Sequence, residues 1–148
     1  MAREIETKCI HLEEEENSIN HYGAISYPIY QSATYAHPGV GQSTGYDYSR
    51  LQNPTREHLE KTVASLENGI DALAFSSGMA AITLMMELFK PGDHLIVDAD
   101  LYGGSIRLFN HVSEKNGIEF SSVDCHKENV AAYIRENTKA VYLSLIHI

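Results

Sequence analysis

The chain has 148 residues, 43% of them hydrophobic and 21% charged, which is normal for a folded globular domain and excludes the disordered and fibrous classes. Its formal net charge of -9 disfavours nucleic acid and acidic membranes as partners. No apolar run approaches the roughly 18 residues of a membrane helix, and the start has no apolar signal core, so we expect a cytoplasmic protein.

The first 50 or so residues are predicted to form an extended arm. Glycine and proline recur through this stretch and interrupt regular structure, at Gly23, Pro28, Pro38, Gly39, Gly41 and Gly45. We interpret the acidic run at residues 13–16 as a solvated loop without an assigned function.

A helix is predicted over residues 56–67. Pro54 cannot lie inside a helix, whereas Thr55 can accept a hydrogen bond from the free amides of a first turn. Apolar residues then recur at helical spacing up to Leu66, and Asn68-Gly69 provides a left-handed stop.

The rest of the chain alternates between two kinds of segment. Strands are predicted at residues 72–75, 94–97, 118–123 and 140–143, and helices at residues 79–89, 105–115 and 127–136. This alternation favours parallel strands joined by right-handed crossovers, hence an α/β fold with three layers, α/β/α, around a mostly parallel sheet. Ligands of such sheets bind outside the carboxyl ends of the strands, so we expect a site at the loops of residues 76–79 and 98–105.

The first of these loops, Ser76-Ser77-Gly78-Met79, connects a predicted strand to a predicted helix. Its backbone amides and hydroxyls converge on the positive end of the helix dipole, which suits a phosphate, and Gly78 permits close approach. The alternative is that the turn only caps the helix. Neither GxGxxG nor GxxxxGK[ST] is present, which counts against dinucleotides and nucleoside triphosphates.

Two further segments carry aromatic or cationic groups. Tyr102, followed by Gly103-Gly104, can stack on a flat ring or can be a surface aromatic in a turn. Arg50, in Tyr48-Ser49-Arg50, offers a guanidinium that pairs with phosphate or forms a surface salt bridge. The two cysteines lie far apart and the histidines form no HxxxH or HExxH pair, so no metal site is expected.

Taken together, these segments resemble the cystathionine γ-synthase family, the Cys/Met-metabolism enzymes of pyridoxal phosphate (PLP) fold type I. The likeness runs from about Ile5 to Tyr142. The matching pieces, in the family's order, are Gly23-Ala24-Ile25 through Pro28-Ile29-Tyr30-Gln31, Tyr48-Ser49-Arg50 with Asn53-Pro54-Thr55, Leu66-Glu67-Asn68-Gly69, Ser76-Ser77-Gly78-Met79-Ala80-Ala81 and Tyr102-Gly103-Gly104-Ser105.

The resemblance implies a cofactor, pyridoxal 5'-phosphate, and residues that bind it. The amides of Gly78 and Met79, with Ser77 in the same loop, would hold its phosphate. Tyr102 would stack on the pyridine ring and is the implied acid-base helper in catalysis, the only catalytic residue that we assign.

The same resemblance implies how subunits and domains are arranged. Tyr48 and Arg50 would reach the phosphate of an adjacent subunit, so the full-length form would be a homodimer or homotetramer. Residues 1–55 would be an N-terminal arm, and residues 56–148 the first part of the large PLP-binding domain, incomplete at its C-terminal end.

The chain departs from the family pattern after Tyr142. The family's Schiff-base lysine lies beyond this point, and residues 143–148 do not match what should follow. We therefore expect a truncated fragment with a foreign end and no turnover of its own. The lysines present are interpreted as solvated and none is taken as catalytic, namely Lys8, Lys61, Lys90, Lys115, Lys127 and Lys139.

The implied activity is transsulfuration on an activated homoserine ester and cysteine or another thiol. Residues 39–46 look most like the branch of cystathionine γ-synthase and O-acylhomoserine thiolyase. The alternatives are a cystathionine β- or γ-lyase or a methionine γ-lyase. A reading of another class is a non-catalytic phosphate-binding or oligomerisation module.

Overall fold

The structure is a computed structural model that describes residues 4–10 and 24–144. The acidic run at residues 13–16 and the end of the chain at residues 145–148 lie outside the described residues. The chain divides into two compact units, Met1–Ala74 and Phe75–Ile148. The predicted boundary between arm and domain, after residue 55, rests on the family resemblance and stays a prediction. Within residues 4–10 and 24–144 no helix is long and apolar enough to cross a membrane.

Among its described residues, the first unit contains the helices α1 (Ile5–Ile10) and α2 (Pro54–Leu66). The predicted helix at residues 56–67 is therefore confirmed, with a start two residues earlier. Helix α1 was not predicted and lies within the stretch that we expected to be extended. Residues 24–53 contain no helix or strand, only the isolated bridges Thr34–Tyr48 and Gly39–Gln42.

The residue that caps α2 is Asn53, so the predicted cap at Thr55 is wrong. The Asn53 Oδ1 atom accepts the backbone N–H groups of Thr55, at 2.9 Å, and Arg56, at 3.2 Å. The Thr55 hydroxyl instead accepts the Tyr30 amide at 2.8 Å and donates to the Pro28 carbonyl at 3.1 Å. The first turn of α2 thereby anchors the irregular segment that precedes it.

The second unit is built on a three-stranded sheet of β1 (His94–Asp98), β2 (Glu119–Val123) and β3 (Thr138–Tyr142). The strand order is β2-β1-β3 and both pairings are parallel, which confirms the predicted α/β class. Central β1 is buried at every position, as expected for a strand that is paired on both edges.

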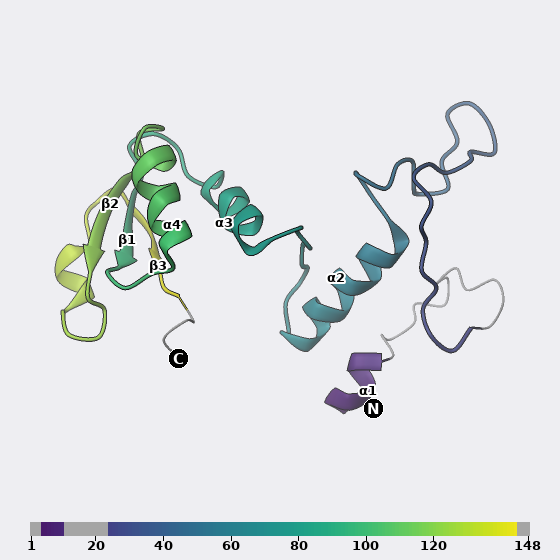
Figure 1. Cartoon of the computed structure of the whole chain (residues 1–148), viewed down its shortest axis with the longest axis horizontal. Coiled ribbons are helices and arrows are strands. Elements are labelled where there is room, and N and C mark those ends of the chain that lie inside the picture. The colour runs from purple at the N-terminus through teal and green to yellow at the C-terminus, as the bar shows by residue number, and fades with distance from the viewer. Residues whose placement is uncertain (1–3, 11–23, 145–148) are drawn as a thin grey trace. The chain divides into compact units, whose positions relative to one another are not determined.

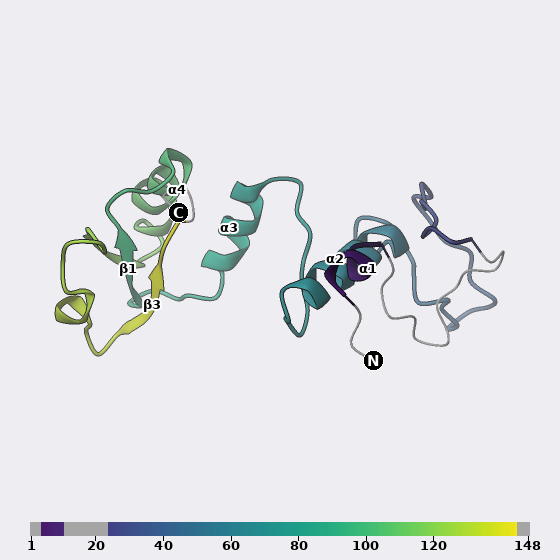
Figure 2. The ribbon, with the colours of Figure 1, turned by 90° about the horizontal axis from the view of Figure 1, so that it is seen from below.

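This unit contains the helices α3 (Gly78–Met86) and α4 (Gly103–Leu108) and the π-helix η1 (Phe109–Ser113), which continues α4. Helix α4 lies over one face of the sheet (Figure 1, Figure 2). Phe109 fills the space between them, since its ring centroid lies 5.1 Å from that of Phe120 and 5.2 Å from that of Tyr142. The core cluster is Met86, Leu95, Val97, Leu101, Phe109 and Ile118.

Two predicted elements are wrong. Residues 72–75 do not form a strand, because the Ala74 amide donates to the Glu60 carboxylate at 2.8 Å and no neighbouring strand pairs with this segment. Residues 127–136 do not form an α-helix but contain the short 3-10 helix η2 (Val130–Tyr133). There the Asn129 side chain accepts the Ala131 amide at 3.2 Å, a local bond that competes with a regular helix.

The fold places two helix starts at one end of the sheet. In Figure 1 the chain leaves the arrowhead of β1, turns, and enters α4, while α3 also begins toward this end. The carboxyl end of a parallel strand is where ligands bind in such sheets. The loops before α3 and α4 are therefore the places to examine for a site.

Candidate functional site

The turn before α3 is exposed and has the geometry of an anion-binding site. Ser77 is the N-cap in extended conformation, and its Oγ atom accepts the Ala80 amide at 3.1 Å. The Gly78 and Met79 amides donate to no other described group, because the first amides of a helix have no intrahelical acceptor. A Cβ atom at Gly78 would meet nothing within 4 Å. Two amides at the positive helix end, with a serine hydroxyl beside them, can hold a phosphate.

The aromatic ring of Tyr102 lies next to this helix. Tyr102 is the N-cap residue of α4 and is 52% exposed. A Cβ atom built at Gly104 would overlap Cε1 of Tyr102 and lie 2.9 Å from Sδ of Met79. The Tyr102 ring and the Met79 side chain therefore meet over Gly104. This arrangement puts an exposed aromatic face beside the helix start that carries the free amides.

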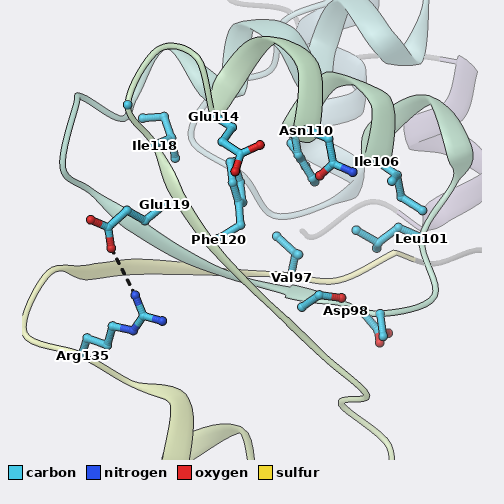
Figure 3. Close-up of a pocket in the computed structure, with 14 residues that line it drawn as sticks. Val97, Asp98, Leu101, Ile106, Asn110, Glu114, Ile118, Glu119, Phe120 and Arg135 are labelled. Atoms are coloured by element: carbon cyan, nitrogen blue, oxygen red, sulfur yellow. Dashed lines mark hydrogen bonds and ion pairs between the residues drawn. The ribbon is translucent and has the colours of Figure 1, made fainter.

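A pocket of about 710 Å³ is lined by residues of β1, β2, α4 and η1 and of the loop between β1 and α4. Its apolar part includes Val97, Leu101 and Phe120, and its rim carries acidic residues, as Figure 3 shows for Asp98, Glu114 and Glu119. Arg135 at the rim is paired with Glu119 at 3.1 Å. Excess negative charge makes this pocket a poor place for a phosphate. None of Ser77, Gly78, Met79 and Tyr102 lines it.

The remaining two predicted site residues, Tyr48 and Arg50, lie together in the first unit. The Arg50 guanidinium carbon is 5.2 Å from the centroid of the Tyr48 ring, a cation–π distance. In residues 4–10 and 24–144 no carboxylate lies within ion-pair distance of Arg50. The alternative for Arg50, a surface salt bridge, is therefore absent from the described residues, and the exposed guanidinium is accessible to an anion.

Sequence reasoning missed two supporting groups. From the sequence, Gly104 is only part of a turn after Tyr102, whereas in the structure its missing side chain makes room for Tyr102 and Met79. Arg56 was not singled out, although it donates to the carbonyls of Ser49 and Leu51, on either side of Arg50. The Gly-Gly pair directly after Tyr102 was a signal for the role of Gly104. No local pattern marks the role of Arg56.

The parallel sheet, the free amides at the start of α3 and the adjacent tyrosine ring define an α/β protein with a site suited to a flat, phosphorylated ligand. Over residues 6–146 the chain matches the family described as Cys/Met metabolism PLP-dependent enzyme. The chain belongs to this family, which confirms the resemblance found in the sequence.

Curated relatives include both synthases and lyases. The chain is 47% identical over 144 residues to a cystathionine gamma-synthase/O-acetylhomoserine (thiol)-lyase of Bacillus subtilis, covering 97% of this chain and 38% of the relative. It is 52% identical over 122 residues to a cystathionine gamma-lyase of the same organism, covering 82% and 32%. The chain therefore spans well under half the length of these relatives.

Solved structures likewise match nearly all of this chain but well under half of their own length. The metB structure from Corynebacterium glutamicum matches with a TM-score of 0.84 and 39% identity, over 95% of this chain and 37% of that one. A cystathionine gamma-lyase from Lactobacillus plantarum, complexed with L-serine, matches with a TM-score of 0.82 and 41% identity, over 95% and 36%. The expected fold type, that of PLP-dependent enzymes of this family, is thereby confirmed for the part of the fold present here.

Proposed function

We propose that this chain carries part of the cofactor site of a PLP-dependent transsulfuration enzyme, of the cystathionine γ-synthase or O-acylhomoserine thiolyase kind. The observation that supports this most is that the Tyr102 ring and the Met79 side chain both lie against Gly104, beside the free amides of α3. PLP has a phosphate for the amides and a flat pyridine ring for the tyrosine. The residues present therefore fit the cofactor that the family name implies.

When bound, PLP supplies an electron sink for carbanions formed on an amino-acid substrate. The chain's own residues then have separate tasks. The Gly78 and Met79 amides hold the phosphate, and the Ser77 hydroxyl, whose oxygen already accepts the Ala80 amide, still has its proton to donate. The Tyr102 ring would lie against the cofactor ring and exclude water from it. Its hydroxyl, free of hydrogen bonds to other described residues, can hold or move a proton at Oη.

We assign Tyr48 and Arg50 to the phosphate of a second copy of the chain. The guanidinium is accessible and stacked on the phenol ring, and this pairing limits the positions that Arg50 can adopt. A site shared between two copies makes a homodimer the smallest complete unit, and a homotetramer can be built from two such dimers. The cytoplasmic location remains a prediction from the sequence.

The cofactor assignment is tested by equilibrium dialysis of the purified chain against PLP and against pyridoxal, which lacks the phosphate. We expect PLP to bind at least about tenfold more tightly, because charge-assisted hydrogen bonds contribute about 1.5–3 kcal/mol each. Equal affinity for the two compounds, or no binding of either, would show that the site does not hold a phosphate and would overturn the proposal.

The shared site is tested by mixing two variants that damage different halves. Arg50→Ala removes the guanidinium, and Ser77→Asp places a negative charge at the phosphate turn. After joint refolding, about a quarter of the sites should be intact, since half of randomly formed dimers are mixed and one of their two sites has both native halves. If the mixture binds PLP no better than either variant, each site lies within one copy.

The substrate class is tested on the complete gene product. Formation of cystathionine from O-acylhomoserine and cysteine would support the synthase. A γ-lyase is the second candidate, because the chain is 52% identical to one over 122 residues. Breakdown of cystathionine without synthesis would favour that alternative.

A further inference from the structure

The turn that carries Tyr48 and Arg50 is short and exposed. The Leu51 and Gln52 amides both donate to the Tyr48 carbonyl at 2.9 Å, which closes one tight turn around Arg50. Tyr48 is 40% exposed and Arg50 is exposed as well. A turn of this kind has few bonds of its own to keep an arginine pointed in one direction. Other groups must restrict it if its guanidinium is to bind an anion well.

Ser49, between the two site residues, is half-buried and anchors the turn. Its amide donates to the Ala33 carbonyl at 2.9 Å, and its hydroxyl donates to the Ser32 carbonyl. The Asn53 Nδ2 atom donates to Ser49 Oγ at 3.0 Å. Since Asn53 also caps α2, the middle of the turn is fixed to the start of a regular helix.

Arg56 holds the two peptide groups on either side of Arg50. Its Nη1 atom donates to the Ser49 carbonyl at 3.0 Å, and its Nη2 atom donates to the Leu51 carbonyl at 2.6 Å. The Nε atom lies 3.6 Å from Glu60 Oε1, one turn along the same helix. One guanidinium in the first turn of α2 therefore bridges both flanks of Arg50 and is itself oriented from α2.

We propose that Arg56 is the positioning residue that presents Arg50, with Tyr48, to a phosphate. This inference rests on the proposed function, which supplies the phosphate as that of PLP. Both Nη atoms of Arg56 donate to the backbone of the turn, and Arg56 does not contact the cofactor. Its guanidinium spans two carbonyls at once, which a lysine ammonium on a flexible stem does not reproduce. Without this bridge Arg50 must be ordered at the moment of binding, and affinity for the phosphate falls.

The test compares PLP with pyridoxal in equilibrium dialysis, and the quantity measured is the ratio of the two dissociation constants. Arg56→Lys keeps the charge and the helix propensity of α2 but loses the bridge. We expect Arg56→Lys to lower the preference for PLP about tenfold, the same loss that we expect of Arg50→Ala, and to leave the affinity for pyridoxal unchanged. The double variant should bind PLP no more weakly than Arg50→Ala alone, because both changes remove the same interaction with the phosphate.

Arg135→Lys is the matched control. Arg135 also donates to a carboxylate and to a hydroxyl, Glu119 and Ser121, each at 3.1 Å, but it lies in the other unit, so its replacement should leave the preference for PLP unchanged. A preference retained by Arg56→Lys, an equal loss of both ligands, or a loss of helical circular dichroism would overturn the positioning role. If the unchanged chain has no preference for PLP, the proposed function itself fails.

Discussion

The ring of Tyr102 folds back over the α-carbon of Gly104 and leaves no room there for a side chain. A Cβ atom at position 104 would overlap Cε1 of Tyr102 and lie 3.0 Å from its Cδ1 atom, with Met79 Sδ at 2.9 Å. Separations below about 3.0 Å are strongly repulsive, so an added methyl group must push the ring or the thioether aside. The glycine thus determines where the tyrosine ring lies.

Gly104→Ala should therefore weaken PLP binding without weakening the fold. The displaced Tyr102 ring loses its stacking on the cofactor, and we expect affinity to fall by about tenfold. Helix stability should be equal or higher, since alanine is favoured over glycine in a helix by about 1 kcal/mol. Dialysis against PLP and thermal unfolding measure the two effects separately.

Gly103→Ala is the matched control for this change. It lies in the same helix, α4, but a Cβ atom at position 103 would meet nothing within 4 Å. Its PLP affinity should equal that of the unchanged chain. If both alanine variants bind PLP equally well, the position of the Tyr102 ring does not matter for the cofactor.

Ser77 caps α3 and lies beside the phosphate in the proposed site, and different substitutions separate these two roles. Ser77→Ala removes the N-cap of α3 and should lower the free energy of unfolding by about 1 kcal/mol, together with PLP affinity. Ser77→Asp keeps a cap and suits the positive helix end, so stability should be retained. Its carboxylate repels a phosphate, however, and PLP affinity should fall by more than about tenfold. Tight PLP binding by Ser77→Asp would rule out the turn as the phosphate site.

The sequence allowed the prediction of features that depend on neighbouring residues. A serine before a glycine at the start of an apolar segment indicates a helix start by residue type alone, and Ser77 is the cap observed. The short apolar run Leu95-Ile96-Val97 contains two β-branched residues, which indicates a buried strand, and β1 is buried throughout. Helix α2 was likewise found because its apolar spacing and its proline are local signals.

Features that depend on distant residues were missed. The segment at residues 72–75 has the composition of a strand, but a strand also needs a partner, and the Ala74 amide binds Glu60 instead. Asn53 contacts the Tyr30 carbonyl across 23 positions of irregular chain. No periodic pattern connects such positions, and the Arg56 bridge could not be predicted from spacing either. The Asn53 cap is a different case, because its side chain accepts the amides two and three residues along, and asparagine directly before Pro54 is a local signal for a helix start.

Glu57 links the irregular segment to α2 and should make the first unit acid-sensitive. Its carboxylate accepts the Tyr46 hydroxyl at 2.5 Å and pairs with Lys61 at 2.7 Å. Lys61 first, and then Tyr46, lower the pKa of Glu57. A lowered carboxyl pKa gives stability that is present above the unfolded value of about 4.3 and is lost as the pH falls through the folded value.

Glu57→Gln should therefore flatten the acid limb, the part of a plot of the free energy of unfolding against pH where stability falls at low pH. Tyr46→Phe should cost about 1 kcal/mol at neutral pH, the usual worth of one hydrogen bond. Glu67→Gln, at an exposed position after the same helix, should leave the acid limb as it is. Urea unfolding followed by circular dichroism measures all three. An unchanged acid limb in Glu57→Gln would show that this carboxylate does not control the response.

His94 is fully buried in the sheet, between two hydroxyl groups on the neighbouring strands. Its Nδ1 atom lies 2.8 Å from Thr138 Oγ1, and its Nε2 atom lies 3.0 Å from Ser121 Oγ. Burial, and then the positive charge of Arg135, lower the pKa of His94, and the nearby Glu119 only partly opposes this. The neutral ring can donate from one nitrogen and accept at the other, and both hydroxyls suit this form.

The second unit should therefore lose stability as the pH falls. A histidine whose pKa is lowered on folding takes up protons more readily in the unfolded chain. The free energy of unfolding therefore begins to decrease as the pH falls below the pKa of the unfolded chain, about 6.5, and the loss is complete once the pH lies below the pKa of the folded chain. Urea unfolding at about pH 7.5 and about pH 5 should show this loss. His94→Gln, which cannot be protonated, should remove most of the difference, whereas His126→Gln, at an exposed position, should preserve it. Equal pH dependence in the two variants would mean that the buried imidazole is not the group responsible.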